Sequence, residues 1–243
     1  MSRKKFETIG LMIDLSRNAV MSMESWRTFI PIISKMGYNA IFLYTEDTYE
    51  VEGEPFFGYM RGRYSIEEMK ELDALGAEWG VEMIPCIQTL GHLSQIFRWG
   101  VYQNDTDYTL LVGSERTYEL IDRMFKTLSE CFRTRRIHIG MDEAPDIGRG
   151  AYMDKHGYRA PNEIMREHLL KVKEIGDKYG YEMLMWSDMF FRPWNNHEYY
   201  TTKVEIPKEY RERLKLDKKV EVVLTESGVV VRNPEYIVIK KPQ

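Results

Sequence analysis

The chain is short of several features that mark specialised classes of protein. Only two cysteines, Cys86 and Cys131, occur in 243 residues, which is too few for a disulfide-stapled extracellular fold. Both lie among apolar neighbours, where free cysteines usually pack as small buried side chains. No apolar run approaches the ~20 residues of a membrane-spanning helix. These absences favour a folded, water-soluble domain.

An excess of charge of one sign is also absent. Lysine and arginine number 34 and aspartate and glutamate 38, so no dominant basic face is expected for nucleic acid. The N-terminus carries three basic residues, Arg3, Lys4 and Lys5, but Asp14 interrupts the apolar run that follows before it reaches the length of a secretory signal. We therefore expect a cytoplasmic protein with neither a nucleic-acid nor a membrane partner.

Strand-like and helix-like segments alternate along the chain. Strands are expected over residues 10–15, 40–44, 82–87, 136–143 and 182–186, and helices over 22–36, 65–80, 115–132 and 162–179. Ser65 with Glu68 forms a capping-box pattern at the start of the second helix. Because helix-length segments separate the strands, the pattern predicts parallel strands and an α/β fold.

The length of 243 residues is close to the ~250 residues of a typical (β/α)8 barrel. A sixth strand is expected over residues 220–224, but turn signals then separate short β-branched runs over 229–231 and 237–239. We predict a (β/α)8 TIM-type barrel that is incomplete, with about six of the eight strands. Residues 1–203 would form this partial barrel, and residues 204–243 an atypical tail with short strands.

The segment from Arg136 to Glu143 carries the clearest functional signal. Side chains alternate along a strand, so we expect His138, Gly140 and Asp142 to share one face. Glu143 follows where the strand ends. Polar residues at the C-terminal ends of barrel strands usually build the active site. Asp142 and Glu143 are therefore the candidate catalytic pair.

The other strand ends are polar too, and in a parallel barrel they would converge on one rim. They carry Ser16-Arg17, Glu46-Asp47, His92, and Trp186 with Asp188. One polar strand end means little, because loops are polar in any case. Five converging ends with two histidines and several acids are harder to explain by structure alone, so they favour a catalytic or binding site.

Two adjacent carboxylates restrict the mechanism. Neighbours at a strand end point in different directions, so Asp142 and Glu143 cannot easily flank one bond at the ~5 Å of a retaining nucleophile and acid. A 2-acetamido sugar avoids this requirement, because its own carbonyl oxygen attacks the anomeric carbon and forms an oxazolinium ion. One carboxylate would then orient the acetamido N–H, and the other would protonate the leaving oxygen and later activate water.

The remaining polar residues suit this chemistry. His92, with Glu46 or Asp47 behind it, would form a carboxylate–histidine relay that tunes Glu143. Arg17 can make charge-assisted hydrogen bonds to sugar hydroxyls. Trp186 offers a flat apolar wall for a pyranose ring or an acetamido methyl group.

Simpler interpretations stay open for each residue. An Asp-Glu pair at a strand end is often a solvated turn or a helix cap, and Arg17 alone would more often be a surface ion-pair residue. We interpret His138 as a structural support of the site. His92, His138, Asp142 and Glu143 lack the compact spacing of a metal site, so we expect neither a metal nor a cofactor.

The segment 138–143 resembles the His-x-Gly-x-Asp-Glu signature of glycoside hydrolase family 20, the β-N-acetylhexosaminidases. Segments 14–17, 44–47, 88–92 and 186–188 resemble the other strand ends of that family, in the same order. The resemblance implies an exo-acting, retaining glycosidase on amino-sugar-containing oligosaccharides or glycoconjugates. It implies that Asp142 orients the acetamido group and Glu143 is the acid/base. It further implies that Arg17, Trp186 and Asp188 bind substrate.

One part of the chain departs from the resemblance. The family carries a tyrosine and an aspartate on its sixth strand and a tryptophan on a later one, whereas residues 221–228 contain neither tyrosine nor tryptophan. The alternative hypothesis is a non-catalytic truncated barrel that at most binds amino sugars. Because an open barrel leaves unpaired strand edges, it would favour association into homo-oligomers.

Overall fold

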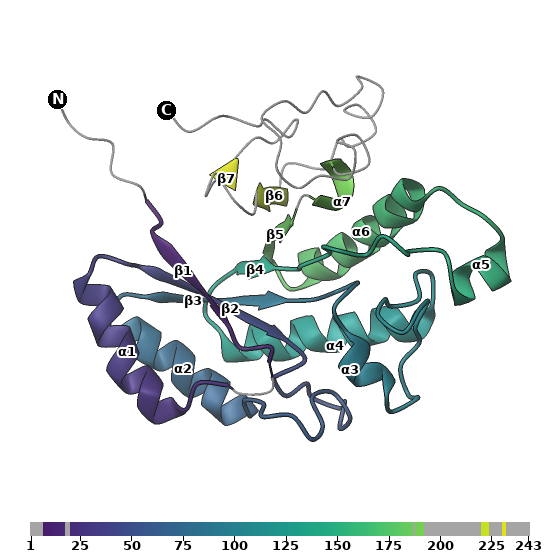
Figure 1. Ribbon diagram of the computed structural model, residues 1–243. Coiled ribbons are helices and arrows are strands. Elements are labelled where there is room, and N and C mark those ends of the chain that lie inside the picture. The colour runs from purple at the N-terminus through teal and green to yellow at the C-terminus, as the bar shows by residue number, and fades with distance from the viewer. Residues whose placement is uncertain (1–6, 18–19, 187, 192–219, 224–229, 232–243) are drawn as a thin grey trace. The chain divides into compact units, whose positions relative to one another are not determined.

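The computed structural model (Figure 1) describes residues 7–17, 20–186, 188–191, 220–223 and 230–231. It divides into two compact units. The first comprises Met1–Ile87 and Arg123–His138, and the second comprises Gln88–Asp122 and Ile139–Gln243.

Four parallel strands form the sheet of the first unit. β1 (Gly10–Asp14) pairs with β2 (Ala40–Glu46), β2 with β3 (Glu82–Ile87), and β3 with β4 (Arg136–His138). β1 alternates between exposed and half-buried residues, whereas most of β2 and β3 is buried. The strands buried on both faces therefore supply the apolar core of this unit.

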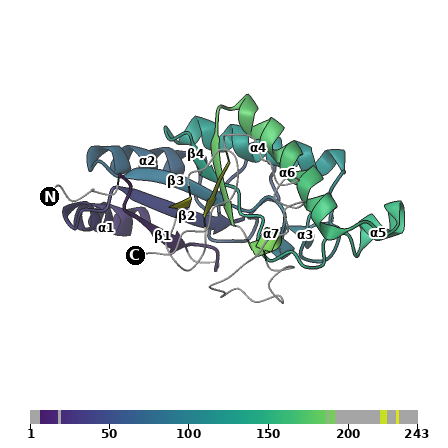
Figure 2. The same ribbon diagram turned by 90° about the horizontal axis from the view of Figure 1, so that it is seen from above.

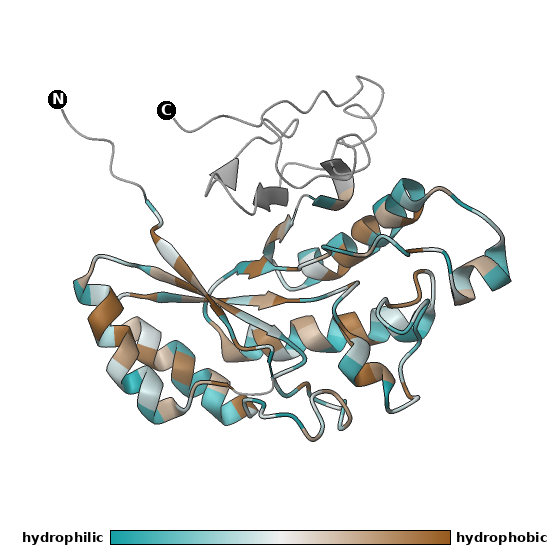
Figure 3. Ribbon diagram, viewed as in Figure 1, coloured by the Kyte–Doolittle hydropathy of each residue, from teal (hydrophilic) through white to brown (hydrophobic). Residues whose placement is uncertain are grey.

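Two helices cover one face of these strands. α1 (Met23–Lys35) and α2 (Ile66–Glu78) lie side by side (Figures 1 and 2), and each carries both apolar and polar stretches (Figure 3). Ser22 caps α1. The capping box predicted for α2 is confirmed, because Ser65 and Glu68 each accept a hydrogen bond from the other's backbone N–H. The caps fix where each helix begins, and buried apolar residues dock it onto the sheet.

The second unit is built around β5 (Glu182–Trp186) and α6 (Pro161–Lys178). β6 (Val220–Val223) pairs parallel to β5, and β7 (Val230–Val231) pairs antiparallel to β6. The short helices are α3 (Ser94–Phe97), α5 (Ala151–His156) and α7 (Asp188–Phe191). α4 (Glu115–Cys131) begins in the second unit and ends in the first.

Most elements expected from the sequence are confirmed, and so is the α/β class with parallel strands. The sixth strand is present at Val220–Val223. The short helices α3, α5 and α7 were not predicted, because four to six residues carry too little periodicity to separate a helix from a loop. Residues 237–239 and the proposed boundary at 203/204 lie outside the described residues.

None of the helices in the described segments is long and apolar enough to cross a membrane. The longest, α6, has 18 residues and includes charged side chains along its length.

A buried histidine on α6 holds the segment that follows β3 in sequence. The Nε2 of His168 lies 2.8 Å from the carbonyl oxygen of Thr89, and its Nδ1 lies 3.3 Å from the Tyr118 hydroxyl. Thr89 in turn donates its backbone N–H and its hydroxyl to the Ile139 carbonyl, at 3.1 and 2.9 Å. Because His168 is fully buried, its pKa falls from 6.5 to about 4. A neutral His168 therefore anchors the backbone just before Gly91 and His92.

We predict that His168 makes folding pH-dependent. Its pKa is lower in the folded protein than in the unfolded chain, so the unfolded chain takes up the proton first as the pH falls. The stabilisation is complete above about pH 6.5 and is lost toward pH 4, by roughly 2–3 kcal/mol. The free energy of unfolding in urea, measured across this range, should show the loss in the parent protein and in His156→Gln, an exposed-site control. His168→Gln should show much less of it, and an identical pH dependence in all three proteins would contradict the prediction.

Candidate active site

The backbone turns sharply after β4, where the two candidate carboxylates lie. Gly140, Met141 and Glu143 have φ angles of +72°, +69° and +49°, a left-handed conformation that costs a non-glycine residue roughly 1 kcal/mol or more. Side chains offset this cost, because the Met141 N–H donates to Gln88 Oε1 at 3.2 Å and the Glu143 N–H donates to Asp188 Oδ2 at 3.0 Å. The turn is thus a fixed feature of the site.

This turn corrects one sequence-based prediction. β4 ends at His138, so the strand alternation that was expected to carry Asp142 onto the same face as His138 and Gly140 is wrong beyond that point. Left-handed residues rotate the chain out of the extended form, and their side chains no longer alternate. Asp142 and Glu143 are adjacent in a turn rather than on a strand.

Gln88 and His92 both lie against the Asp142 carboxylate. The Gln88 amide nitrogen Nε2 lies 2.7 Å from Asp142 Oδ1, and His92 Nε2 lies 3.3 Å from Oδ2. Burial raises the pKa of Asp142, but the hydrogen bonds from His92 and Gln88 outweigh burial and hold the pKa below its ordinary 3.8. Asp142 is therefore an ionised, oriented carboxylate at neutral pH.

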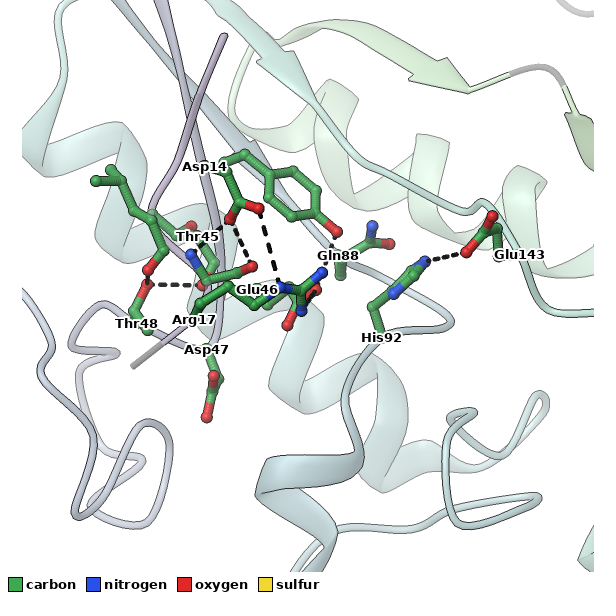
Figure 4. A network of polar contacts seen from close by, with 12 residues as sticks. Asp14, Arg17, Thr45, Glu46, Asp47, Thr48, Gln88, His92 and Glu143 are labelled. Carbon is green, nitrogen blue, oxygen red and sulfur yellow. Dashed lines mark hydrogen bonds and ion pairs between the residues drawn. The ribbon is translucent and has the colours of Figure 1, made fainter. Parts of the chain in front are cut away.

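Glu143 lies next to the same histidine but is more accessible. Its Oε2 is 3.6 Å from His92 Nε2, and Figure 4 shows the two side chains pointing toward each other. The Glu143 side chain is 48% exposed, against 17% for Asp142. One imidazole nitrogen thus faces both carboxylates. An exposed carboxyl beside a buried, ionised one gives two different environments, which suits two different roles in acid–base chemistry.

His92 has a second partner that the sequence did not suggest. The Tyr108 hydroxyl lies 2.6 Å from His92 Nδ1, and the two rings meet edge to face with centroids 5.0 Å apart. His92 itself has a left-handed backbone, with φ +58°. The imidazole is thus contacted at both nitrogens, by Tyr108 on one side and the carboxylates on the other.

Asp188 supports the turn through the backbone of Glu143. It is 8% exposed, and its Oδ2 accepts the Glu143 N–H, while its Oδ1 is buried without a hydrogen-bond partner among the described residues. Burial, with smaller contributions from Asp142 and Glu143, raises the pKa of Asp188 from 3.8 to about 6. The substrate-binding role expected for Asp188 stays a prediction, and the contact that the structure gives it is to the backbone of Glu143.

Trp186 ends β5, and its side chain is partly exposed. The backbone N–H of Trp186 donates to the Gly140 carbonyl at 3.1 Å, which ties the end of β5 to the start of the turn. This contact places the end of β5 beside the turn that carries the two carboxylates. Its role as a wall for a sugar ring stays a prediction.

The first unit has its own cluster of charged residues at strand ends. Figure 4 shows the Arg17 side chain beside Glu46 and Asp14. Its guanidinium lies 3.5 Å from Glu46 Oε1 and 3.9 Å from Asp14 Oδ2. Tyr44 also donates its hydroxyl to Glu46, at 3.1 Å. The Arg17 side chain is 74% exposed. Its guanidinium is therefore accessible to solvent while Glu46 orients it. This exposure leaves room for the predicted hydrogen bonds to sugar hydroxyls.

Asp47 and His138, which were also predicted to support the site, contact other residues of the first unit. The Asp47 side chain is almost fully buried and pairs with Arg61 at 3.1 Å. His138 is fully buried on β4, where it pairs with Cys86 of β3. The proposed relay from Glu46 or Asp47 to His92, and the supporting role of His138, stay predictions.

Two residues of the site were not predicted. Gln88 belongs to the quoted segment 88–92, but nothing in the sequence marked its amide as a partner of Asp142. Tyr108 lies in a loop with no motif, 16 residues from His92. The described part of the chain contains no group of three or more histidine, cysteine, aspartate or glutamate residues arranged to hold a metal ion.

Comparison with known proteins supports one family. The model of the glycosyl hydrolase family 20 catalytic domain matches residues 6–230. Hexosaminidase D of Bos taurus is 25% identical over 170 residues, covering 65% of this chain and 49% of that protein. A β-hexosaminidase of Vibrio furnissii is 29% identical over 148 residues, covering 52% of this chain and 24% of that protein. The chain spans about half or less of the length of these curated relatives.

Solved structures share the fold. A family 20 exo-β-N-acetylglucosaminidase from Vibrio harveyi, crystallised with N-acetylglucosamine, has a TM-score of 0.70 at 18% identity, over 90% of this chain and 38% of that one. A β-N-acetylhexosaminidase from Bacteroides fragilis has a TM-score of 0.67 at 15% identity, over 88% of this chain and 44% of that one. The prediction of a TIM-type barrel class is thereby confirmed.

We predict that the charge on Asp188 destabilises the folded protein. Its pKa of about 6 lies above the ordinary 3.8, so the folded state binds this proton more tightly, and stability is lost as the pH rises from about 4 through 6. Asp188→Asn keeps an acceptor for the Glu143 N–H without the charge. Its free energy of unfolding should exceed that of the parent by roughly 2 kcal/mol near pH 8 and match it near pH 4. Asp154→Asn, at an exposed site on α5, should follow the parent, and a pH-independent loss of stability in Asp188→Asn would refute the prediction.

Proposed function

The chain belongs to glycosyl hydrolase family 20, and we propose from that premise that it removes terminal, non-reducing β-linked N-acetylhexosamine residues from oligosaccharides or glycoconjugates. The observation that carries the proposal is the grouping of Asp142, Glu143 and His92, in which one ionised and one accessible carboxyl group share an imidazole nitrogen. Relatives named as hexosaminidases support the same substrate class.

In the proposed reaction the substrate supplies the nucleophile. The acetamido carbonyl oxygen attacks the anomeric carbon while the bond from that carbon to the leaving oxygen breaks, and Glu143 gives its proton to the leaving oxygen. The oxazolinium ion that results carries the positive charge. Water then attacks the anomeric carbon, Glu143 takes a proton from it, and the acetamido group is restored. Two inversions at the anomeric carbon give overall retention of configuration.

Asp142 suits the role of holding the acetamido group. Developing positive charge on the acetamido nitrogen needs an anion at a fixed position, and a preorganised anion stabilises it more than water does. The hydrogen bonds from Gln88 and His92 keep Asp142 ionised and restrict its rotation. Glu143, with half of its side chain exposed, is accessible to a leaving oxygen.

The remaining roles are part of the proposal. Arg17 would bind sugar hydroxyls through its exposed guanidinium, and Trp186 would contact the apolar face of the sugar or its acetamido methyl group. Asp188 would bind substrate, and Glu46, Asp47 and His138 would support the site. A direct relay from Glu46 or Asp47 to His92 would compete with the contacts that Tyr108 and the two carboxylates make with its ring nitrogens. A cytoplasmic location and association into homo-oligomers rest on the sequence alone.

We predict that Glu143 is required for turnover. The purified chain should hydrolyse a chromogenic β-N-acetylglucosaminide but not the corresponding glucoside, which lacks the internal nucleophile. Glu143→Gln should lower kcat by roughly 10²–10⁴-fold, the usual contribution of a general acid–base residue, and leave the affinity for N-acetylglucosamine unchanged. Glu78→Gln, an exposed change on α2, is the matched control.

Three outcomes distinguish the hypotheses. Equal turnover by Glu143→Gln and the parent protein would remove the assigned role of Glu143. Equal turnover of the glucoside and the N-acetylglucosaminide would reject substrate assistance. Binding of N-acetylglucosamine without hydrolysis would favour the alternative, a non-catalytic amino-sugar-binding barrel.

A further inference from the structure

The histidine between the two carboxylates has two neutral forms, and its neighbours decide between them. A neutral imidazole carries one proton, on Nδ1 or on Nε2, and the other nitrogen then accepts a hydrogen bond. His92 Nε2 lies 3.3 Å from an oxygen of Asp142 and 3.6 Å from an oxygen of Glu143, while its Nδ1 lies 2.6 Å from the Tyr108 hydroxyl. When both carboxyl groups are ionised, only the form protonated on Nε2 satisfies both sides of the ring.

We propose that Tyr108 is a positioning residue that donates its hydroxyl proton to His92 Nδ1 and so fixes the imidazole proton on Nε2, facing Asp142 and Glu143. A phenol is protonated near neutral pH and can donate to an unprotonated ring nitrogen. An ionised carboxylate only accepts hydrogen bonds, so Asp142 requires the proton on Nε2. With the opposite tautomer, the lone pair of Nε2 would face the carboxylate oxygens.

The structure fixes Tyr108 at both its backbone and its ring. Its N–H lies 3.4 Å from Thr106 Oγ1, and its carbonyl oxygen accepts the Leu93 N–H at 3.4 Å. The ring passes so near residue 91 that a Cβ on Gly91 would approach Tyr108 Cε1 to 3.2 Å, so the glycine leaves room for the ring. The Tyr108 backbone is thus hydrogen-bonded to Leu93, which follows His92, and its ring packs against Gly91, which precedes His92.

The loop that carries Tyr108 is also tied to the segment that follows the carboxylates. Asp105 is buried, and its carboxylate accepts three backbone N–H groups, from Gly148, Gly150 and Tyr152, at 2.5, 3.0 and 2.9 Å. Thr109 donates its hydroxyl to Asp146 at 3.2 Å. These bonds flank Tyr108 on both sides in sequence, so hydrogen bonds hold the loop that carries its ring.

The consequence for catalysis rests on the proposed function. A His92 that presents an N–H to Asp142 keeps that carboxylate ionised and oriented for the acetamido group. The same N–H is within reach of Glu143 when Glu143 has given up its proton and carries a negative charge. Tyr108 therefore acts on the reaction through His92 and has no contact with the reacting atoms in this proposal.

The direct test is the protonation state of the His92 ring nitrogens. In protein labelled with ¹⁵N at histidine, the imidazole shifts near neutral pH should show Nε2 protonated and Nδ1 unprotonated, with His92→Asn used for assignment. Tyr108→Phe should convert His92 to a mixture of tautomers, and Tyr158→Phe, an exposed-site control, should leave it unchanged. A proton on Nδ1 in the parent protein, or an unchanged tautomer in Tyr108→Phe, would overturn the proposal.

Kinetics test the consequence separately. Tyr108→Phe should lower kcat for the N-acetylglucosaminide by roughly tenfold, the effect of losing one hydrogen bond of about 1.4 kcal/mol, with KM unchanged and the pH profile shifted. His92→Gln places an amide N–H near the position of Nε2 and should retain more activity than His92→Asn, whose amide lies near Nδ1. Equal activity of Tyr108→Phe and the parent would end the positioning role. Absence of hydrolysis in every protein would reject the proposed function, and the ¹⁵N shifts would then decide the tautomer alone.

Discussion

The structure of the site depends on keeping a largely buried carboxylate, that of Asp142, charged. Burial raises the pKa of Asp142, and the hydrogen bonds from His92 and Gln88, with smaller contributions from the His92 charge and a backbone N–H, outweigh it. Hydrogen bonds to a charged group contribute roughly 1.5–3 kcal/mol each, which is enough to decide whether the group is ionised. The positions of both donors are therefore as important to the proposed chemistry as the carboxylate itself.

These positions follow from the way the strand ends are held. Gln88 directly follows β3 and contacts both the side chain of Asp142 and the N–H of Met141, so one amide fixes the turn and orients the acid. Asp188 fixes the same turn at Glu143. His168 holds Thr89 from α6, which sets the path of the chain into His92. The left-handed turn after β4 persists because these contacts compensate for its strain.

Much of the fold and the grouping of the main site residues could be predicted from the sequence. Parallel strands place their C-terminal ends on one rim, so His92 and the pair Asp142-Glu143 were expected to meet, and within the second unit they do. The left-handed turn was not predicted, because its stability comes from Gln88, 54 residues away in sequence from Asp142, and from Asp188, 45 residues from Glu143. Tyr108 could not be found either, because a loop tyrosine without a motif gives no sign of which side chain it will meet.

The most direct test of substrate assistance is the affinity for a stable analogue of the cyclic intermediate. A thiazoline fused to N-acetylglucosamine has the shape of the oxazolinium ion, and an enzyme that stabilises that ion should bind the analogue at least ~10²-fold more tightly than N-acetylglucosamine. Isothermal titration calorimetry gives the dissociation constants of the analogue and of N-acetylglucosamine for the parent protein and for Asp142→Asn. The account predicts tight binding by the parent and loss of the advantage in Asp142→Asn. Equal affinities for the analogue and for N-acetylglucosamine in the parent protein would contradict it.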